Sequence, residues 1–244
     1  MCDSAYWMGP NRRAFLMNKV EGLHHLAITT ADLKGQLQFF AEKLGMELQA
    51  LYWMHGVENT VHAFMRLNDE SSIAFVSNPQ IGEIETVMGQ THAGTAANNS
   101  APGTMQHLAL KVKDEAELLA MRDRLRSHGV PVIGPIEHGM CQSIYFAGLE
   151  SLTLELSFSP EPISAEAWVD PEVVALVGLT AEELAALKAP EAFIDSQGGV
   201  VQPGIDAKGP HLAYPEAIYE RLLQTPDELV KYSVENEPPV KVGV

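Results

Sequence analysis

Residues 25–32 read HLAITTAD, and residues 107–114 read HLALKVKD. The two stretches are similar to one another at an offset of 82 residues (107 − 25 = 82). Each is a short alternating apolar run, which is the pattern of a half-buried strand. Such an internal repeat indicates that one supersecondary unit occurs twice, and the organisation of the chain follows from it.

Each copy continues with the same order of elements. A helical pattern of apolar residues comes first, and it ends near a glycine, Gly45 in the first copy and Gly129 in the second. Three further strand-like runs follow in each copy. These runs are Met46–Trp53, Val61–Leu67 and Ser72–Val76 in the first copy, and Val130–Ile136, Ser143–Phe146 and Leu152–Phe158 in the second.

The sequence therefore predicts an α+β domain over residues 21–158, built from two βαβββ modules at 21–78 and 104–158. Residues 1–20 form a separate N-terminal segment. Residues 159–244 read as a helical and irregular C-terminal extension, in which Thr180 and Glu183 have the spacing of a capping box.

Composition excludes several classes of partner. The chain has 244 residues, a formal charge of −16 and a pI near 4.9, which argues against nucleic acid and anionic membranes because both require a basic surface. Its two cysteines form neither a disulfide framework nor a metal clip. No apolar run is long enough to span a bilayer. Together with the absence of a signal-peptide pattern, these features predict a cytoplasmic protein.

Alternation along three strands identifies the candidate chemistry. Residues two apart share one face of a strand. The large apolar residues of these strands must pack against the helices, so His25, His107 and Glu155 lie on the other face. Their same-face neighbours are mostly small, which leaves space around them. Two imidazoles and one carboxylate with open coordination positions suit Fe(II), with Mn(II) or Zn(II) as alternatives.

The repeat with HLAI, HLAL and LTLEL resembles the vicinal oxygen chelate superfamily, which includes glyoxalases, bleomycin-resistance proteins and type I extradiol dioxygenases. The resemblance implies a cupped mixed sheet formed by both modules around a metal. It also implies that His25, His107 and Glu155 are the metal ligands. Four-ligand members carry Glu or Gln at the end of the first module, where this chain reads SSIAFVSN, so the resemblance favours the three-ligand dioxygenases.

Three further residues extend this resemblance. Tyr145 lies ten residues before Glu155, His92 lies fifteen before His107, and His138 lies seven before Tyr145. Extradiol dioxygenases have a similarly spaced tyrosine and histidines, although His138 deviates by two positions. A hairpin between the last two strands would place Tyr145 directly opposite Glu155. The resemblance implies catalytic roles for Tyr145, His92 and His138 in binding substrate and oxygen and in moving protons.

His62 and Trp53 are the expected substrate contacts, because both fall in strands near the predicted cup. The function predicted is an Fe(II)-dependent extradiol-type dioxygenase that cleaves a catechol-like aromatic diol with O2. A metal-dependent isomerase, epimerase or lyase acting without O2 is the main alternative. A ligand-sequestering module of the bleomycin-resistance kind is a third, which the retained triad disfavours. The sequence is compatible with a homo-oligomer.

Overall fold

The chain is described by a computed structural model that covers residues 20–191, 199–206 and 208–241. Residues 1–19 of the expected N-terminal segment lie outside this range. Leu23–Ser164, which contains the repeat, belongs to one compact unit, and Ala165–Glu235 belongs to another. The repeat unit carries the candidate site.

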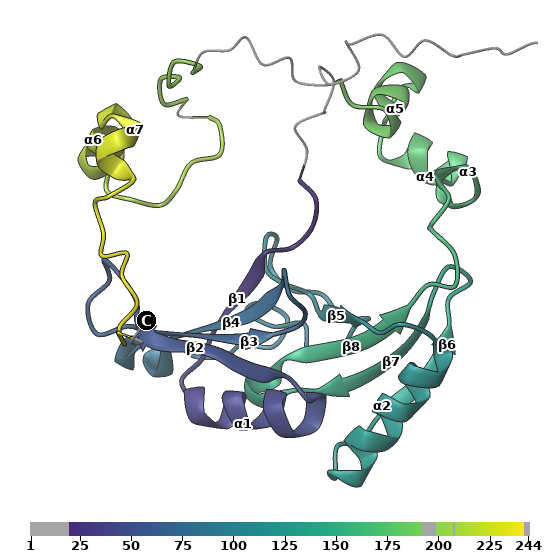
Figure 1. The fold of residues 1–244 in the computed structure, drawn as a ribbon. Coiled ribbons are helices and arrows are strands. Elements are labelled where there is room, and N and C mark those ends of the chain that lie inside the picture. The colour runs from purple at the N-terminus through teal and green to yellow at the C-terminus, as the bar shows by residue number, and fades with distance from the viewer. Residues whose placement is uncertain (1–19, 192–198, 207, 242–244) are drawn as a thin grey trace, which may run out of the picture. The chain divides into compact units, whose positions relative to one another are not determined.

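Both copies of the repeat fold as βαβββ modules, which confirms the predicted α+β class (Figure 1). The first module contains β1 (His25–Thr29), α1 (Leu33–Leu44), β2 (Glu47–Trp53), β3 (Val61–Arg66) and β4 (Ser72–Ser77), followed by a 3-10 helix, η1 (Pro79–Glu83). The second contains β5 (Leu108–Lys111), α2 (Glu115–Ser127), β6 (Ile133–Glu137), β7 (Gln142–Ala147), the 3-10 helix η2 (Leu149–Ser151) and β8 (Thr153–Phe158).

Each module forms a mixed four-stranded sheet of the same topology. The strand orders are β1-β4-β3-β2 and β5-β8-β7-β6, with the first pair of each sheet parallel and the other pairs antiparallel. β6 begins three residues later than the sequence predicts. The amide of Val130 instead donates to Leu125 O and completes the end of α2.

The helices begin and end where the sequence signals indicate. The side chain of Asp32 accepts from Gly35 N at the start of α1, and Gly45 ends this helix with φ of 77°. At the start of α2, the side chain of Asp114 accepts from Glu117 N. Each module therefore carries its own local stop and start signals, which define the helix that covers its sheet.

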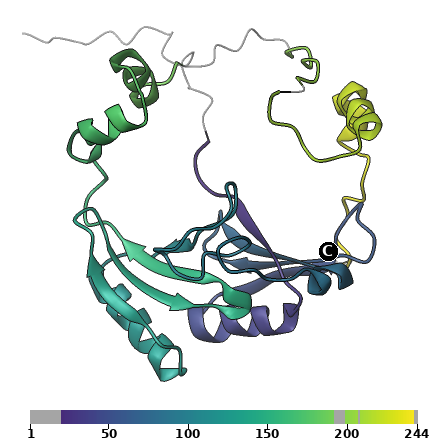
Figure 2. The same cartoon turned by 180° about the vertical axis from the view of Figure 1, so that it is seen from behind.

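Both helices lie on the same side of the two sheets (Figures 1 and 2). The core on that side joins buried strand residues to buried helix residues. It contains Ile28, Met65, Ile73, Phe75, Leu110, Ile144, Leu154 and Leu156 from the strands and Phe40, Leu118 and Leu125 from the helices. We call the opposite side of the sheets, which carries His25, His62, Phe64, Tyr145 and Glu155, the helix-free face.

Charged side chains of the second module hold α1 at both of its ends. The Glu150 carboxylate, in the turn between β7 and β8, accepts from the amides of Ala31 and Asp32 at 2.8 and 3.2 Å and from the Thr30 hydroxyl. It also accepts from Gln36 Nε2 at 3.0 Å. A carboxylate at this end complements the helix dipole and satisfies amides that the helix itself leaves free.

Arg124 of α2 binds the other end of α1. Its guanidinium donates to the carbonyl oxygens of Lys43 at 3.0 Å and Glu42 at 2.8 Å. These carbonyls lie in the last turn of α1, where no helical amide follows to satisfy them. The two modules are thus joined through both termini of a single helix.

The second unit consists of short helices, which confirms the helical C-terminal extension. They are α3 (Ala165–Trp168), α4 (Pro171–Leu176), α5 (Ala181–Lys188), α6 (Glu216–Gln224) and α7 (Asp227–Val230). Thr180 and Glu183 form the predicted capping box at the start of α5. None of the residues in these five helices is buried. Among the described residues, no helix combines the length and apolar character needed to cross a membrane.

Replacing Glu150 with Gln should lower the free energy of unfolding at neutral pH by about 1–2 kcal/mol, because a neutral amide accepts these hydrogen bonds more weakly. Burial alone would raise the pKa of Glu150, but its hydrogen bonds outweigh burial and hold that pKa below its usual range. The charge therefore stabilises the fold above the unfolded-state pKa of about 4.3, and this stabilisation is lost as the pH falls through the folded-state pKa.

Urea unfolding at a series of pH values measures this effect, and the difference between wild type and Glu150→Gln should shrink as the solution becomes acidic. Glu83→Gln is the matched control, because Glu83 is exposed in η1. A difference that stays constant from neutral to acidic pH would show that the Glu150 charge does not hold the modules together.

Candidate functional site

Glu155 is the buried acidic group at the centre of the helix-free face. It lies in the middle of β8, where it pairs with Ala109 of β5 on one side and Tyr145 of β7 on the other. The register between Tyr145 and Glu155 is the one that the sequence predicts. Only 5% of Glu155 is exposed, so the cost of burying its charge must be offset by a partner.

His107 is that partner among the described residues. It immediately precedes β5, and its Nε2 lies 2.9 Å from Glu155 Oε2. The other ring nitrogen, Nδ1, contacts the side-chain oxygen of Gln106. Two of the three predicted metal ligands are therefore brought together by the parallel pairing of β5 with β8.

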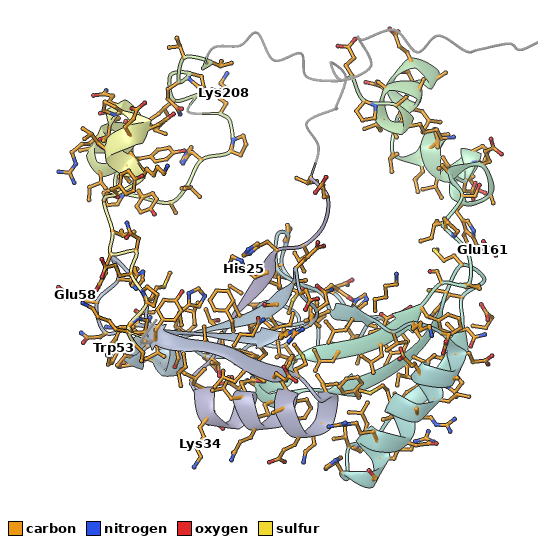
Figure 3. All side chains as sticks on the ribbon, viewed as in Figure 1. His25, Lys34, Trp53, Glu58, Glu161 and Lys208 are labelled. Atoms are coloured by element: carbon orange, nitrogen blue, oxygen red, sulfur yellow. The ribbon has the colours of Figure 1, made fainter. Side chains whose placement is uncertain are left out.

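His25 contributes from the first module. It is the first residue of β1, it pairs with Ser72 of β4, and Figure 3 shows it on the side of the sheets away from α1. Its Nδ1 lies 2.8 Å from Nδ1 of His24, and its ring centroid lies 5.4 Å from that of Phe64. In the part of the chain that the structure describes, no group of three or more His, Cys, Asp or Glu side chains is close enough to hold a metal ion. His25 accordingly lies apart from the His107–Glu155 pair.

The His107–Glu155 pair fits a divalent metal chemically. Two donors that each lie about 2.1 Å from one ion, at right angles, are about 3.0 Å apart, and the observed N–O separation is 2.9 Å. A metal would also neutralise a carboxylate whose side chain is only 7% exposed. The donors are nitrogen and oxygen without thiolate, a set that suits iron, manganese or zinc.

Tyr145 and His138 form a hydrogen-bonded pair beside this carboxylate. The Tyr145 hydroxyl lies 3.0 Å from His138 Nε2, and the two rings meet edge to face. Burial and then the negative charge of Glu155 raise the pKa of Tyr145. Its hydroxyl therefore keeps its proton at neutral pH and can donate it to a neighbouring oxygen or nitrogen.

His62 lies on the same face in the first module. Its Nδ1 is 3.4 Å from the Tyr52 hydroxyl, and its Nε2 is buried without a hydrogen-bond partner among the described residues. Burial, and then the nearby His25, lower the pKa of His62. The ring is therefore neutral at neutral pH, and its Nε2 is available to a ligand.

A family model described as Glyoxalase/Bleomycin resistance protein/Dioxygenase superfamily matches residues 22–158, more than half of the chain. The protein belongs to this superfamily. The matched range agrees closely with the repeat domain that the sequence predicts, 21–158, and with the two βαβββ modules. No curated protein sequence matches the chain significantly.

The chain is also similar to several solved structures. A glyoxylase/bleomycin resistance protein/dioxygenase domain from Frankia sp. has 16% identity, covers 58% of this chain and 99% of its own, and has a TM-score of 0.45. A fosfomycin resistance protein from Listeria monocytogenes, complexed with Mn(II), has 16% identity, coverage of 62% and 100%, and a TM-score of 0.40. A lactoylglutathione lyase from Agrobacterium tumefaciens has 15% identity, coverage of 57% and 93%, and a TM-score of 0.40.

Two predicted site residues of this superfamily member lie elsewhere in the repeat domain. His92 lines a cavity of about 560 Å³ together with β1 residues, Met105 and Glu150, and His25, His107 and Glu155 do not line this cavity. Trp53 is 69% exposed at the end of the edge strand β2. Because Trp53 pairs with Val61 and its neighbour Tyr52 pairs with His62, alternation turns Trp53 away from the helix-free face.

Three further residues near the site make contacts that the sequence did not predict. They are Tyr52, Phe64 and Gln106. Tyr52 and Phe64 stack with their ring planes 9° apart, and Phe64 lies 4.5 Å from His62 between ring centroids. The pairing of β2 with β3 could have identified Tyr52. The register of this pairing is set at the loop between the strands, where Trp53 pairs with Val61, and sequence periodicity does not fix that pair.

Replacing His62 with Gln should reduce the loss of stability in mild acid. The folded-state pKa of His62 is lowered, so the unfolded chain binds the proton more readily once the pH falls below about 6.5. The stabilising contribution of neutral His62 is present above that value and is lost as the pH falls toward its folded-state pKa. Urea unfolding above and below about pH 6.5 measures this slope, which should be shallower in the variant than in the wild type. Equal slopes would show that His62 is not held neutral by the fold.

Proposed function

We propose that this superfamily member is a metal-dependent, extradiol-type dioxygenase that cleaves a catechol-like aromatic diol with O2, using Fe(II) or, as an alternative, Mn(II). Zn(II) would suit only a reaction without O2. The observation that carries the proposal is the pairing of Tyr145 with Glu155, with His138 hydrogen-bonded to the tyrosine hydroxyl. This arrangement supports a proton-handling group directly beside a carboxylate and imidazole that fit a metal.

His107 and Glu155 would hold the ion from the second module, and His25 would complete the ligand set from the first. When bound, Fe(II) or Mn(II) would supply Lewis acidity that favours ionised diol oxygens, together with the redox chemistry that O2 requires, whereas Zn(II) has no redox chemistry and would supply Lewis acidity alone. Completion of the set requires the His25 imidazole to approach the other two ligands. His25 lies at the first position of β1, where a strand end allows such movement more readily than its centre.

Tyr145 would bind and orient the substrate oxygens. Its raised pKa keeps the phenol protonated, so it donates a hydrogen bond rather than accepting a proton at neutral pH. His138, 3.0 Å away, would resupply a proton to the hydroxyl after Tyr145 has donated its own. Such a pair can act as a general acid, which donates a proton to the atom that gains negative charge when an oxygen–oxygen or carbon–carbon bond breaks.

The first module would receive the aromatic ring. Phe64 and Tyr52 provide stacked aromatic surfaces, and the unpartnered Nε2 of His62 can hydrogen-bond a ring substituent. On the opposite side, Ile133 pairs with Tyr145 and is 67% exposed, which supplies an apolar contact. His92 is assigned to substrate or oxygen contact by its spacing alone, and this role requires the 89–104 connection to move.

A metal-dependent isomerase, epimerase or lyase is the second candidate. The Tyr145–His138 pair could move a proton between carbon and oxygen of a bound carbonyl compound without O2. The two possibilities differ in whether O2 is consumed. Residues at the end of the first module favour the dioxygenase, because Ala74 occupies the centre of β4 where a further acidic or amide ligand would stand.

Replacing Glu155 with Gln should weaken metal binding by at least about 100-fold, because it removes the only anionic ligand and leaves the ion charge uncompensated. Isothermal titration of anaerobic protein with Fe(II), and with Mn(II) or Zn(II) in parallel, measures this. Glu70→Gln on the exposed β3–β4 turn is the control and should bind metal as the wild type does. Unchanged affinity in Glu155→Gln would remove Glu155 from the ligand set.

Replacing Tyr145 with Phe should lower turnover by about 10²–10⁴ while the metal content stays intact, because only the hydroxyl is removed. The assay is O2 uptake by the Fe(II)-loaded protein with catechols. Tyr232→Phe in the C-terminal extension, where the side chain is exposed, should retain full activity. Full activity of Tyr145→Phe would contradict the role of the hydroxyl, and metal binding without O2 uptake would favour the isomerase or lyase.

A further inference from the structure

The side-chain amide of Gln106 connects His107 to a loop of the 89–104 connection. Its oxygen, Oε1, contacts His107 Nδ1. Its nitrogen, Nε2, donates to the carbonyl oxygens of Thr95 at 3.2 Å and Asn98 at 3.1 Å. All the polar atoms of this amide are thereby used within the chain.

These contacts determine which way the Gln106 amide faces. Backbone carbonyls only accept hydrogen bonds, so the NH2 group of Gln106 must point toward Thr95 and Asn98. Its oxygen must then point toward His107. Since an amide oxygen only accepts, His107 must carry a hydrogen on Nδ1.

The consequence falls on the other ring nitrogen. In neutral His107 a hydrogen on Nδ1 leaves Nε2 with a free lone pair, and this atom faces Glu155 Oε2 at 2.9 Å. An imidazole lone pair and a carboxylate oxygen cannot hydrogen-bond to each other. Either a second proton on His107 or a metal ion held by both atoms satisfies this contact, and in both cases Nδ1 keeps its hydrogen. A hydrogen bond at the second nitrogen is the usual way in which metal-binding histidines are oriented.

The same local arrangement occurs in the first copy of the repeat. Gln106 lies at the repeat offset of 82 from His24 (106 − 24 = 82), and His24 contacts Nδ1 of the following residue, His25, at 2.8 Å. In each module, the residue before the predicted ligand thus contacts Nδ1 of that ligand, so Nε2 is the nitrogen left to face a metal. The repetition indicates that this contact belongs to the module and is not an accident of one loop.

We propose that Gln106 is a positioning residue, which fixes the Nδ1–H tautomer of His107 so that Nε2 binds the metal together with Glu155. This inference rests on the proposed metal site but not on ring cleavage. Because Thr95 and Asn98 hold the Gln106 amide, the connection that carries His92 also sets the orientation of a metal ligand. Any rearrangement of this connection on substrate binding would therefore reach the metal through Gln106.

The first test is the tautomer itself. NMR of metal-free protein with ¹⁵N-labelled histidine distinguishes a protonated Nδ1 from a protonated Nε2, and His107→Asn assigns the signals. Wild-type His107 should carry a hydrogen on Nδ1, either alone or together with one on Nε2. Gln106→Met, which keeps the length of the side chain and removes the acceptor at Nδ1, should increase the share of the form protonated on Nε2 alone, because Glu155 then remains as the acceptor at the ring. An Nε2–H tautomer in the wild type would overturn the proposal without reference to any variant.

The second test is metal affinity, with Zn(II) as the probe in isothermal titration. Gln106→Met should bind Zn(II) about 10–100-fold more weakly than the wild type, and Gln106→Glu, which restores an acceptor for Nδ1–H, should recover most of the affinity. Gln80→Met on the exposed η1 turn is the matched control and should leave affinity unchanged. If Gln106→Met binds Zn(II) as tightly as the wild type does, the role of Gln106 is overturned but the proposed metal site is not. Failure of the wild type to bind metal overturns the proposed metal site as well.

Discussion

The arrangement of the repeat domain depends on α1, which the second module holds at both ends. Glu150 binds the amides and side chains at its first turn, and Arg124 binds the carbonyl oxygens at its last turn. Each charge has the sign that the helix dipole favours at that end. These contacts matter because the two sheets are separately hydrogen-bonded, so no continuous ladder fixes one module against the other.

Once the modules are joined, the buried charge of Glu155 organises the chemistry of the helix-free face. Its strand neighbours are Ala109 and Tyr145, and its carboxylate contacts His107 Nε2. A small residue on one side leaves room, while a phenol with a raised pKa on the other keeps a proton close by. A carboxylate in such a setting is costly for stability, and metal binding would offset that cost.

The two modules share a topology but present different chemistry. The second supplies the buried carboxylate and the Tyr145–His138 pair, whereas the first supplies an aromatic cluster of Tyr52, Phe64 and a neutral His62. This division suits a ligand that is apolar on one side and oxygen-bearing on the other. Membership of the superfamily does not determine the reaction, because one fold can carry many reactions. The reaction depends on these side chains.

The sequence by itself determined the repeat, the order of its elements and the faces of its strands, because HLAITTAD and HLALKVKD alternate strictly and local caps such as Asp32 and Gly45 define the helices. It also predicted that Tyr145 stands opposite Glu155, since hairpin register follows from the residues between the strands. Only the tertiary structure decided that Tyr52 rather than Trp53 faces His62, because the register of the β2–β3 hairpin depends on the conformation of the loop 54–60 between the strands. It alone decided that Gln106 contacts His107 and that His25 lies apart from the His107–Glu155 pair, since these positions depend on a loop conformation and on the docking of two modules that periodicity does not encode.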